Sequence, residues 1–320
     1  AGGLVWANLL RPGAGVAIAG LDAAAPTDAL SLADLVLGIV PANPIEAMAT
    51  GNVLQVIFFA LLTGLAINAV GEAAAPLRRF FNAAAEIVYK ITHWVMEAAP
   101  YGVFALIAWV AGTNGIAVLR PLAMLIVTLY VACLVHMALV SGLLVGVLAR
   151  LNLWQFLRGI RDAQLVAFST STSSGTLPVT LTCAQENLGI SRGVSSFVLP
   201  VGATMNMDGT AIYMGIAAVF TAQAVGVTLD MADYGAIILS GTLASIGAAG
   251  VPSAGLILIP LVLSSVGLPV EAIAVIAGID RVLDMMRTAT NVTGDAAVAT
   301  VVAKSEGELD EAVFAHRPVV

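Results

Sequence analysis

Charged residues are scarce in this chain. They make up 10% of its 320 residues, against about 25% in a typical soluble domain. Hydrophobic residues make up 59%, and the mean hydropathy is +0.98. Water cannot solvate a surface of that composition, so we expect a lipid bilayer around the chain. The net charge of −7 comes from 13 basic and 20 acidic residues that form no basic patch or acidic tail, which excludes nucleic acid as a partner.

Cysteine is nearly absent as well. Cys133 and Cys183 both lie in apolar or Ser/Thr-rich stretches, and two isolated cysteines form neither a disulfide framework nor a zinc-binding spacing. We interpret them as small buried residues. The chain begins Ala-Gly-Gly-Leu, without Met or a basic leading region, so we predict no signal peptide and an N-terminally truncated sequence.

Two hydrophobic runs are long enough to cross a membrane, which takes roughly 20 mostly apolar residues. Residues 53–71 contain no charge, and residues 122–149 contain only His136. Residues 80–110 have a helical pattern that Pro100 interrupts. We interpret this third stretch as a further span whose first part is amphipathic.

Two other hydrophobic runs are broken near their middle. Residues 234–270 contain a Gly- and Pro-bearing segment at 247–255, and residues 165–185 contain the Ser/Thr-rich segment 169–178. Because glycine and proline interrupt helices, each arm is too short to span the membrane. We therefore predict two re-entrant hairpins, whose non-helical tips are tolerated only inside protein or beside a watery cavity.

Each broken run is followed by a hydrophobic segment that carries polar groups, at 194–229 and 272–303. The order hairpin, helix, hairpin, helix predicts an internal repeat, which is typical of transporters with a binding site near the midplane. Alternating spans place most arginines on one side of the membrane, as the positive-inside rule requires. The half-helix ends at the two tips would offer free backbone N–H groups, which favour an anionic ligand.

The last hydrophobic segment carries an aligned set of polar residues. Charges at bilayer depth cost roughly 2.5 to 3.5 kcal/mol each, so such a set predicts an interior binding site rather than a structural ion pair alone. At about 100° per residue, the members of this polar stripe share one helix face: Asp280, Asp284, Arg287, Thr288, Asn291 and Asp295.

The functional groups of the polar stripe indicate a substrate and an ion. Arg287 offers a planar fork that matches a carboxylate, and Asp284 suits an ammonium group. Together they indicate an amino acid. Asp208 and Asp295, flanked by asparagines and unwound backbone, supply hard oxygen ligands of the kind that bind alkali cations. Sodium is the natural candidate.

Five motifs, in order along the chain, carry a resemblance to a known family. They are Ser-Ser-Gly-Thr-Leu-Pro at 173–178, Asn-Met-Asp-Gly-Thr at 206–210, Gly-Val-Pro at 250–252, Asp-x-x-Arg-Thr at 284–288 and Asn-Val-Thr-Gly-Asp at 291–295. With these motifs the chain resembles the glutamate transporter homologues, the dicarboxylate/amino acid:cation symporters, from about Leu9 to Lys304. The resemblance implies sodium-coupled symport of aspartate or glutamate in the plasma (inner) membrane, with sodium as coupling ion and no cofactor.

The resemblance also implies an all-α multi-pass elevator fold with two re-entrant hairpins and inverted repeats, assembled as a homotrimer. Residues 1–29 would be the end of a preceding helix and an extracellular loop, 30–112 the scaffold and trimerisation helices, 113–308 the transport domain and 309–320 a cytoplasmic tail. The transport domain would consist of a helix, a hairpin at 155–190, a broken helix at 192–229, a hairpin at 232–266 and a helix at 268–304.

Binding residues follow from the same resemblance. Arg287 would hold the side-chain carboxylate of the substrate and Asp284 its amino group. The remaining substrate contacts would come from Thr210, Thr288 and Asn291 and from backbone at Ser171, Ser173, Val251 and Gly255. The sodium ions would take Gly202, Asn206, Asn291 and Asp295 at one site, Thr204 with the Ser245, Ile246 and Ala248 carbonyls at a second, and Asn206 with Asp208 at a third.

The chain departs from the family pattern in two respects. The missing N-terminal helices would leave the scaffold and the third sodium site incomplete. Some relatives carry an additional arginine at the positions that match Ser171 or Met285, and neither residue is basic here. Arg281 is the candidate replacement, although it lies at the edge of the polar stripe.

The sequence also allows other functions. Within the same family, the substrate would be a C4-dicarboxylate or a neutral amino acid; Asp284 argues against the first and Arg287 against the second. A channel lined by the hairpin tips is less favoured, because buried opposite charges indicate a binding site. An intramembrane serine hydrolase would use a serine within 169–174 with His93 or His136, but no Gly-x-Ser-x-Gly elbow supports it.

Overall fold

The computed structural model describes residues 1–15, 38–50 and 52–315, and the predicted all-α character is confirmed for this part of the chain. It contains no strand, only an isolated antiparallel bridge between Ile190 and Leu309. The predicted segments at 16–29, 30–37 and 316–320 lie outside the described residues. The helices are α1 (Gly2–Leu10), α3 (Pro44–Thr50), α4 (Val53–Val70), α5 (Ala75–Glu97), α6 (Ala99–Asn114), α7 (Leu119–Ser141), α8 (Leu153–Gly159), α9 (Arg161–Thr170), α10 (Ser173–Thr182), α11 (Arg192–Met205), α12 (Asp208–Val225), α13 (Met231–Ile246), α14 (Ala254–Ser264), α15 (Ile273–Ala277), α16 (Asp280–Ser305) and α17 (Glu311–Ala315).

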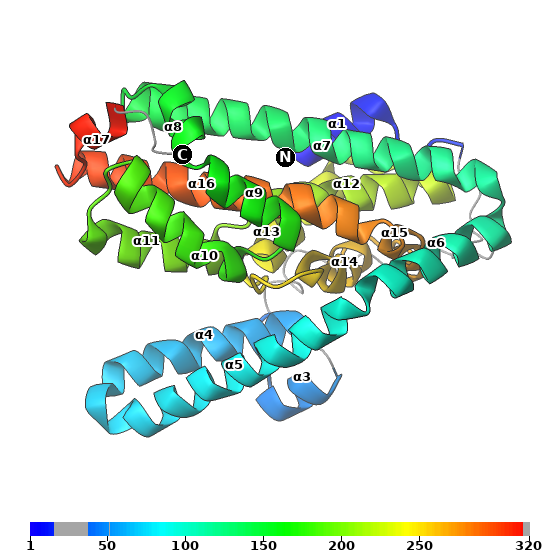
Figure 1. The fold of residues 1–320 in the computed structure, drawn as a ribbon. Helices are drawn as coiled ribbons and strands as arrows, with labels where there is room; N and C mark the ends of the chain where they lie inside the picture. Colours follow the sequence, from blue (N-terminus) through cyan, green and yellow to red (C-terminus); the bar gives the residue numbers. More distant parts are fainter. Residues whose placement is uncertain (16–37, 51, 316–320) are drawn as a thin grey trace.

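Helices α3, α4 and α5 form an arm that is set apart from the other helices, and α6 connects this arm to the rest of the chain (Figure 1). Apolar side chains of the arm, such as Leu61, Leu65 and Phe80, are exposed in the single chain. Exposed apolar surface of this extent is typical of a face that lipid or another protein covers.

Two described stretches are long and apolar enough to cross a membrane, Gln55–Val88 and Ile116–Leu148. They overlap the spans predicted at 53–71 and 122–149. The third predicted span is indeed interrupted, because α5 ends at Glu97 and α6 begins two residues later with proline in its first turn. Proline fits there since the first N–H groups of a helix have no partner within it.

The helices break at the segments where the sequence predicted interruptions. Helices α9 and α10 contact each other and are separated by Ser171 and Thr172, here called the first tip. Ser171 is left-handed, with φ 56°, and Thr172 caps α10 by accepting a hydrogen bond from the Gly175 amide at 3.0 Å. Helices α13 and α14 are likewise in contact and are separated by residues 247–253, the second tip.

Helix α16, which carries the polar stripe, lies in the middle of the molecule. It contacts α7, α9, α10, α11 and α12, and Figure 1 shows it running between α7 and the α10–α11 pair. Most of its side chains between Asp280 and Ala303 are buried. A third break, at Asn206 and Met207, separates α11 from α12 beside it. The polar stripe therefore faces protein from several directions.

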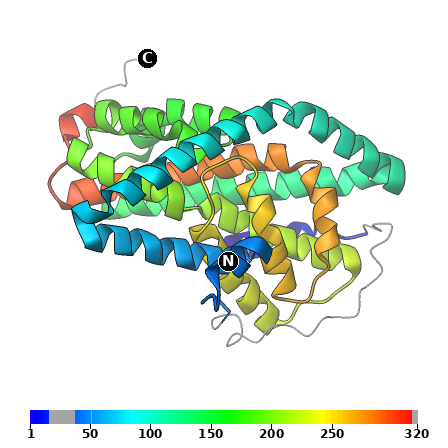
Figure 2. The same ribbon diagram turned by 90° about the horizontal axis from the view of Figure 1, so that it is seen from below.

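Two predicted boundaries differ from the structure. The helix expected at 268–304 is divided into the 3₁₀ turn Val270–Ala272, α15 and α16, because the chain leaves α15 at Gly278 and Ile279. Glycine has low helix propensity, and the break allows α15 to pack on α6 and α14, as Figure 2 shows for α14 and α15. The hairpin expected at 155–190 begins inside α8. Both cysteines are free and buried, as predicted.

Candidate substrate and cation site

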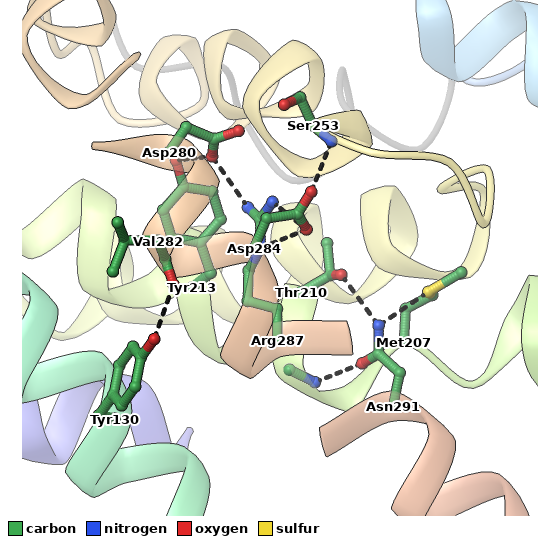
Figure 3. A network of polar contacts seen from close by, with 11 residues as sticks. Tyr130, Met207, Thr210, Tyr213, Ser253, Asp280, Val282, Asp284, Arg287 and Asn291 are labelled. Carbon is green, nitrogen blue, oxygen red and sulfur yellow. Dashed lines mark hydrogen bonds and ion pairs between the residues drawn. The ribbon is translucent and has the colours of Figure 1, made fainter. Parts of the chain in front are cut away.

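Arg287 is the centre of the site. Its side chain is 1% exposed and lies between two carboxylates of its own helix (Figure 3). Its Nη2 is 2.6 Å from Asp284 Oδ1, its Nε donates to the same oxygen at 3.2 Å, and its Nη1 is 3.4 Å from Asp280 Oδ1. The spacings of three and seven residues put all three groups on one helix face. The predicted stripe thus forms a buried charge network.

A tyrosine completes the surroundings of this guanidinium. The ring of Tyr213, on α12, lies with its centroid 4.1 Å from Arg287 Cζ, and its hydroxyl donates to Asp280 Oδ1 at 3.1 Å. An aromatic face attracts a desolvated cation, so the ring takes the place of water. No sequence motif indicated this residue, since an isolated tyrosine in an apolar helix has no distinguishing spacing.

The terminal nitrogens of Arg287 retain capacity for hydrogen bonding. Both lie within ion-pair distance of a carboxylate oxygen, but neither makes a directed hydrogen bond to any described residue. The nitrogen–oxygen distances thus fit ion pairs, but the N–H bonds do not point at the carboxylate oxygens. Because a hydrogen bond requires that alignment, these N–H groups can still donate to a ligand. A planar carboxylate is the group that matches this fork.

The second tip lies directly over this network. The backbone amide of Ser253 donates to Asp284 Oδ2 at 2.6 Å, and Ser253 itself is left-handed, with φ 61°. A Cβ at Gly255 would lie only 2.5 Å from Arg287 Nη1. Glycine at this position is what permits α14 to approach the guanidinium.

The two tips contact each other as well. The carbonyl oxygen of Gly250 accepts hydrogen bonds from Thr172 Oγ1 at 2.6 Å and from the Ser174 amide at 3.1 Å. Ser171 and Ser173 are buried beside this contact, and Val251 is half-buried. The structure therefore places Ser171, Ser173 and Val251, three of the backbone positions predicted for the substrate, at or next to the contact between the two tips.

Asn291 connects the polar stripe to the break between α11 and α12. Its Oδ1 accepts from the Gly209 amide at 2.8 Å, and its Nδ2 lies 3.5 Å from Thr210 Oγ1 and 3.1 Å from the sulfur of Met207. Thr210 and Thr288, both predicted substrate contacts, are buried. The unwound segment thus lies against the predicted substrate residues.

Carboxylate and amide oxygens gather one to two turns further along α16. Asn206 Nδ2 donates to Asp295 Oδ1 at 3.0 Å. A Cβ at Gly202 would lie 2.6 Å from the same oxygen, and a Cβ at Gly294 would lie 2.9 Å from Asp208 Oδ2. These glycines allow backbone to approach both carboxylates closely. Gly202, Asn206 and Asp295, predicted for one sodium ion, are thus neighbours.

The residues predicted for the second sodium ion lie on adjacent helices. Thr204 is in α11, and Ser245, Ile246 and Ala248 lie at or just past the end of α13, which contacts α11. The hydroxyl of Thr204 donates to the Val201 carbonyl at 2.9 Å. Among the described residues, no three His, Cys, Asp or Glu side chains lie together in a group that could hold a metal ion.

The sequence as a whole decides the family. A profile described as the sodium:dicarboxylate symporter family matches residues 1–305. The chain belongs to this family. The resemblance drawn from its five motifs is therefore confirmed.

Three relatives of this chain are all described as transporters, but their descriptions name different substrates. It is 36% identical over 318 residues to a proton/sodium-glutamate symport protein of Bacillus caldotenax, which covers 97% of this chain and 75% of the relative. It is 40% identical over 324 residues to a C4-dicarboxylate transport protein of Rhodospirillum rubrum, covering 96% and 70%. It is 43% identical over 269 residues to human excitatory amino acid transporter 2, covering 83% and 47%.

Membership of the symporter family settles the class of the chain. It is an integral transporter of the plasma membrane and not an enzyme. The serine hydrolase interpretation was therefore wrong. In the structure, His136 Nε2 lies 3.3 Å from Asp208 Oδ2. His136 is therefore a neighbour of Asp208, which was predicted to bind sodium. Its position in an apolar run did not indicate this contact.

Proposed function

We propose that the chain is a sodium-coupled secondary active symporter of acidic amino acids, aspartate or glutamate. The observation that carries this proposal is the buried Asp284–Arg287 pair. The terminal nitrogens of its guanidinium make no directed hydrogen bond to a described residue. Arg287 would bind the side-chain carboxylate of the substrate and Asp284 its ammonium group. Such a pair selects a ligand that carries both charges, because either charge alone would leave a buried group without its partner.

The coupling ion in this proposal is sodium. The support is the group of oxygen-bearing residues around Asp295, in which glycines admit backbone close to the carboxylates. Relatives described as proton/sodium symporters make a monovalent coupling cation the expectation for the family. One sodium ion would bind at Gly202, Asn206, Asn291 and Asp295, one at Thr204, Ser245, Ile246 and Ala248, and one at Asn206 and Asp208.

We also propose that α9–α10 and α13–α14 are re-entrant hairpins. Helices α9, α10 and α14 have 10, 10 and 11 residues and α13 has 16; at 1.5 Å per residue the first three are about 15 Å long and α13 about 24 Å. All four helices are shorter than a hydrocarbon core of roughly 30 Å. Ser171 in the first tip and Ala248 and Gly250 in the second are buried, and the two tips contact each other; irregular backbone at membrane depth is tolerated where protein surrounds it or where it lines a watery cavity.

The proposed transport cycle is an elevator movement within a homotrimer. Residues 30–112 would be the scaffold and 113–308 the transport domain. The support is the separation of the arm from the other helices (Figure 1) and its exposed apolar side chains. Chemical cross-linking of the purified protein should give trimers; a monomer as the largest species would overturn the assembly.

A C4-dicarboxylate or a neutral amino acid remains the alternative substrate, since one relative is described as a C4-dicarboxylate transport protein. Asp284 favours the amino acid, because a dicarboxylate without an amine would leave it facing a second negative group. Arg287 disfavours a neutral amino acid, because its charge would lose a partner.

The deciding experiment is uptake of labelled aspartate by the purified protein in proteoliposomes, with and without an inward sodium gradient. We expect uptake only with the gradient, and competition by glutamate but not by succinate or serine. Uptake that ignores sodium would overturn the ion assignments. Uptake of labelled succinate with no uptake of aspartate would establish the C4-dicarboxylate alternative.

A further inference from the structure

Arg281 connects the polar helix to the first tip. It lies in the first turn of α16, and its Nη2 donates to the backbone oxygen of Ser169 at 3.1 Å, across 112 positions of sequence. Ser169 is in the last turn of α9, where backbone carbonyls lack partners within the helix. A cation at a helix C-terminus also interacts favourably with the helix dipole. Arg281 therefore caps α9 from a neighbouring helix.

The backbone that Arg281 holds is unfavourable by itself. Ser171, two residues after Ser169, has φ 56°, a conformation that costs a non-glycine residue free energy unless its surroundings enforce it. On the other side, Thr172 is bound to Gly250 of the second tip at 2.6 Å. The first tip is thus held from two directions, by Arg281 and by the second tip.

Arg281 also keeps a donor near this tip. Its Nη1 is buried without a hydrogen-bond partner among the described residues, and so is the hydroxyl of Ser171. Residues 280–287 contain two aspartates and two arginines, so their formal charges cancel. An acidic amino acid adds two carboxylates and one ammonium group, a net charge of −1. Arg287 and Asp284 account for one carboxylate and the ammonium, which leaves the second carboxylate without a charged partner among Asp280, Asp284 and Arg287.

We propose that Arg281 is a positioning residue that sets specificity for the second carboxylate of the substrate. By binding the Ser169 carbonyl it keeps the first tip in the turn that directs its backbone amides to that carboxylate, and its charge favours substrates with two carboxylates over those with one. This inference rests on the proposed function, since it assumes that an amino acid binds at Asp284 and Arg287.

The test compares Arg281→Gln and Arg281→Lys with the unaltered protein in proteoliposomes at saturating sodium. Charge-assisted hydrogen bonds support a change of about tenfold in affinity. We expect Arg281→Gln to raise the KM for aspartate about tenfold with Vmax within about twofold, and Arg281→Lys to restore part of the loss. The second carboxylate is the α-carboxylate, because Arg287 is proposed to bind the side-chain carboxylate. The concentration of β-alanine that half-inhibits uptake should therefore not change, since β-alanine keeps an amine and one carboxylate but lacks the α-carboxylate. Amide hydrogen exchange should increase at 171–175 but not in the interior of α16.

Arg161→Gln is the matched control, because Arg161 lies at the other end of α9 and pairs only loosely with Asp162, at 3.8 Å on the surface. It should leave the aspartate KM unchanged. The inference is overturned if Arg281→Gln leaves the aspartate KM within about twofold, or if inhibition by β-alanine weakens in parallel. Failure of the unaltered protein to transport aspartate would instead overturn the proposed function.

Discussion

The backbone amide of Ser253 donates a 2.6 Å hydrogen bond to Oδ2 of Asp284, whose other oxygen is bound by Arg287. The carboxylate proposed for the substrate amine is therefore already bound by the second tip. An ammonium group that approaches Asp284 must share these oxygens with the tip or displace it. Substrate binding and the position of the α13–α14 tip are thus linked through one side chain.

Replacing Asp284 by asparagine should separate these two roles. The amide oxygen still accepts from Ser253, but the charge that attracts an ammonium group is lost. We expect the KM for aspartate to rise at least about tenfold, while succinate, which has no amine, becomes a better competitor relative to aspartate. Initial uptake rates in proteoliposomes measure both. Asp162→Asn, an exposed site, is the control; an aspartate KM within twofold of normal contradicts the amine role.

Arg287→Cys should abolish uptake of acidic substrates and spare or create uptake of neutral ones. The change removes the only guanidinium group in the polar stripe and leaves a smaller, uncharged side chain under the second tip. Uptake of labelled aspartate and serine gives the result directly. Arg78→Cys controls for the introduced thiol, because Arg78 lies on the exposed arm and forms only a loose ion pair with Glu72, at 3.8 Å. Unchanged aspartate transport would eliminate Arg287 as the carboxylate ligand.

Gly255→Ala should impair transport without unfolding the protein. The added Cβ would lie 2.5 Å from Arg287 Nη1 and 3.1 Å from Cζ, so either the guanidinium or the second tip must shift. We expect at least about a tenfold loss of aspartate affinity with the thermal midpoint nearly unchanged. Gly235→Ala in α13, where the Cβ has no neighbour within 4 Å, should behave normally. Equal behaviour of the two variants would show that the close approach is unimportant.

Asp295→Asn should weaken sodium binding while preserving shape. A neutral amide can still meet Asn206 but no longer attracts a cation with a full charge. We expect the sodium concentration for half-maximal aspartate uptake to increase at least about tenfold, with maximal uptake approached at high sodium. Uptake measured over a series of sodium concentrations at fixed aspartate tests this. A sodium dependence that superimposes on that of Asp162→Asn would remove Asp295 from the ion site.

The arrangement of the helices was accessible from the sequence where local features decide it. Hydrophobic length predicted the spans near α4 and α7, and glycine, proline and serine clusters predicted the breaks at Ser171 and at 247–253. The boundary at Gly278 was missed, because a single glycine in an apolar run does not by itself require a break. Local signals locate interruptions, but packing decides which of them end a helix.

Helical periodicity is a property of the backbone alone, so the order of residues is enough to tell which groups share the face of α16. It therefore predicted that Asp284 and Arg287 would be neighbours. The contacts between distant groups came from the packing of the helices: Tyr213 against Arg287, His136 against Asp208, Ser253 against Asp284 and Arg281 against Ser169. Periodicity specifies the direction of a side chain, whereas its partner depends on how helices far apart in the chain pack together.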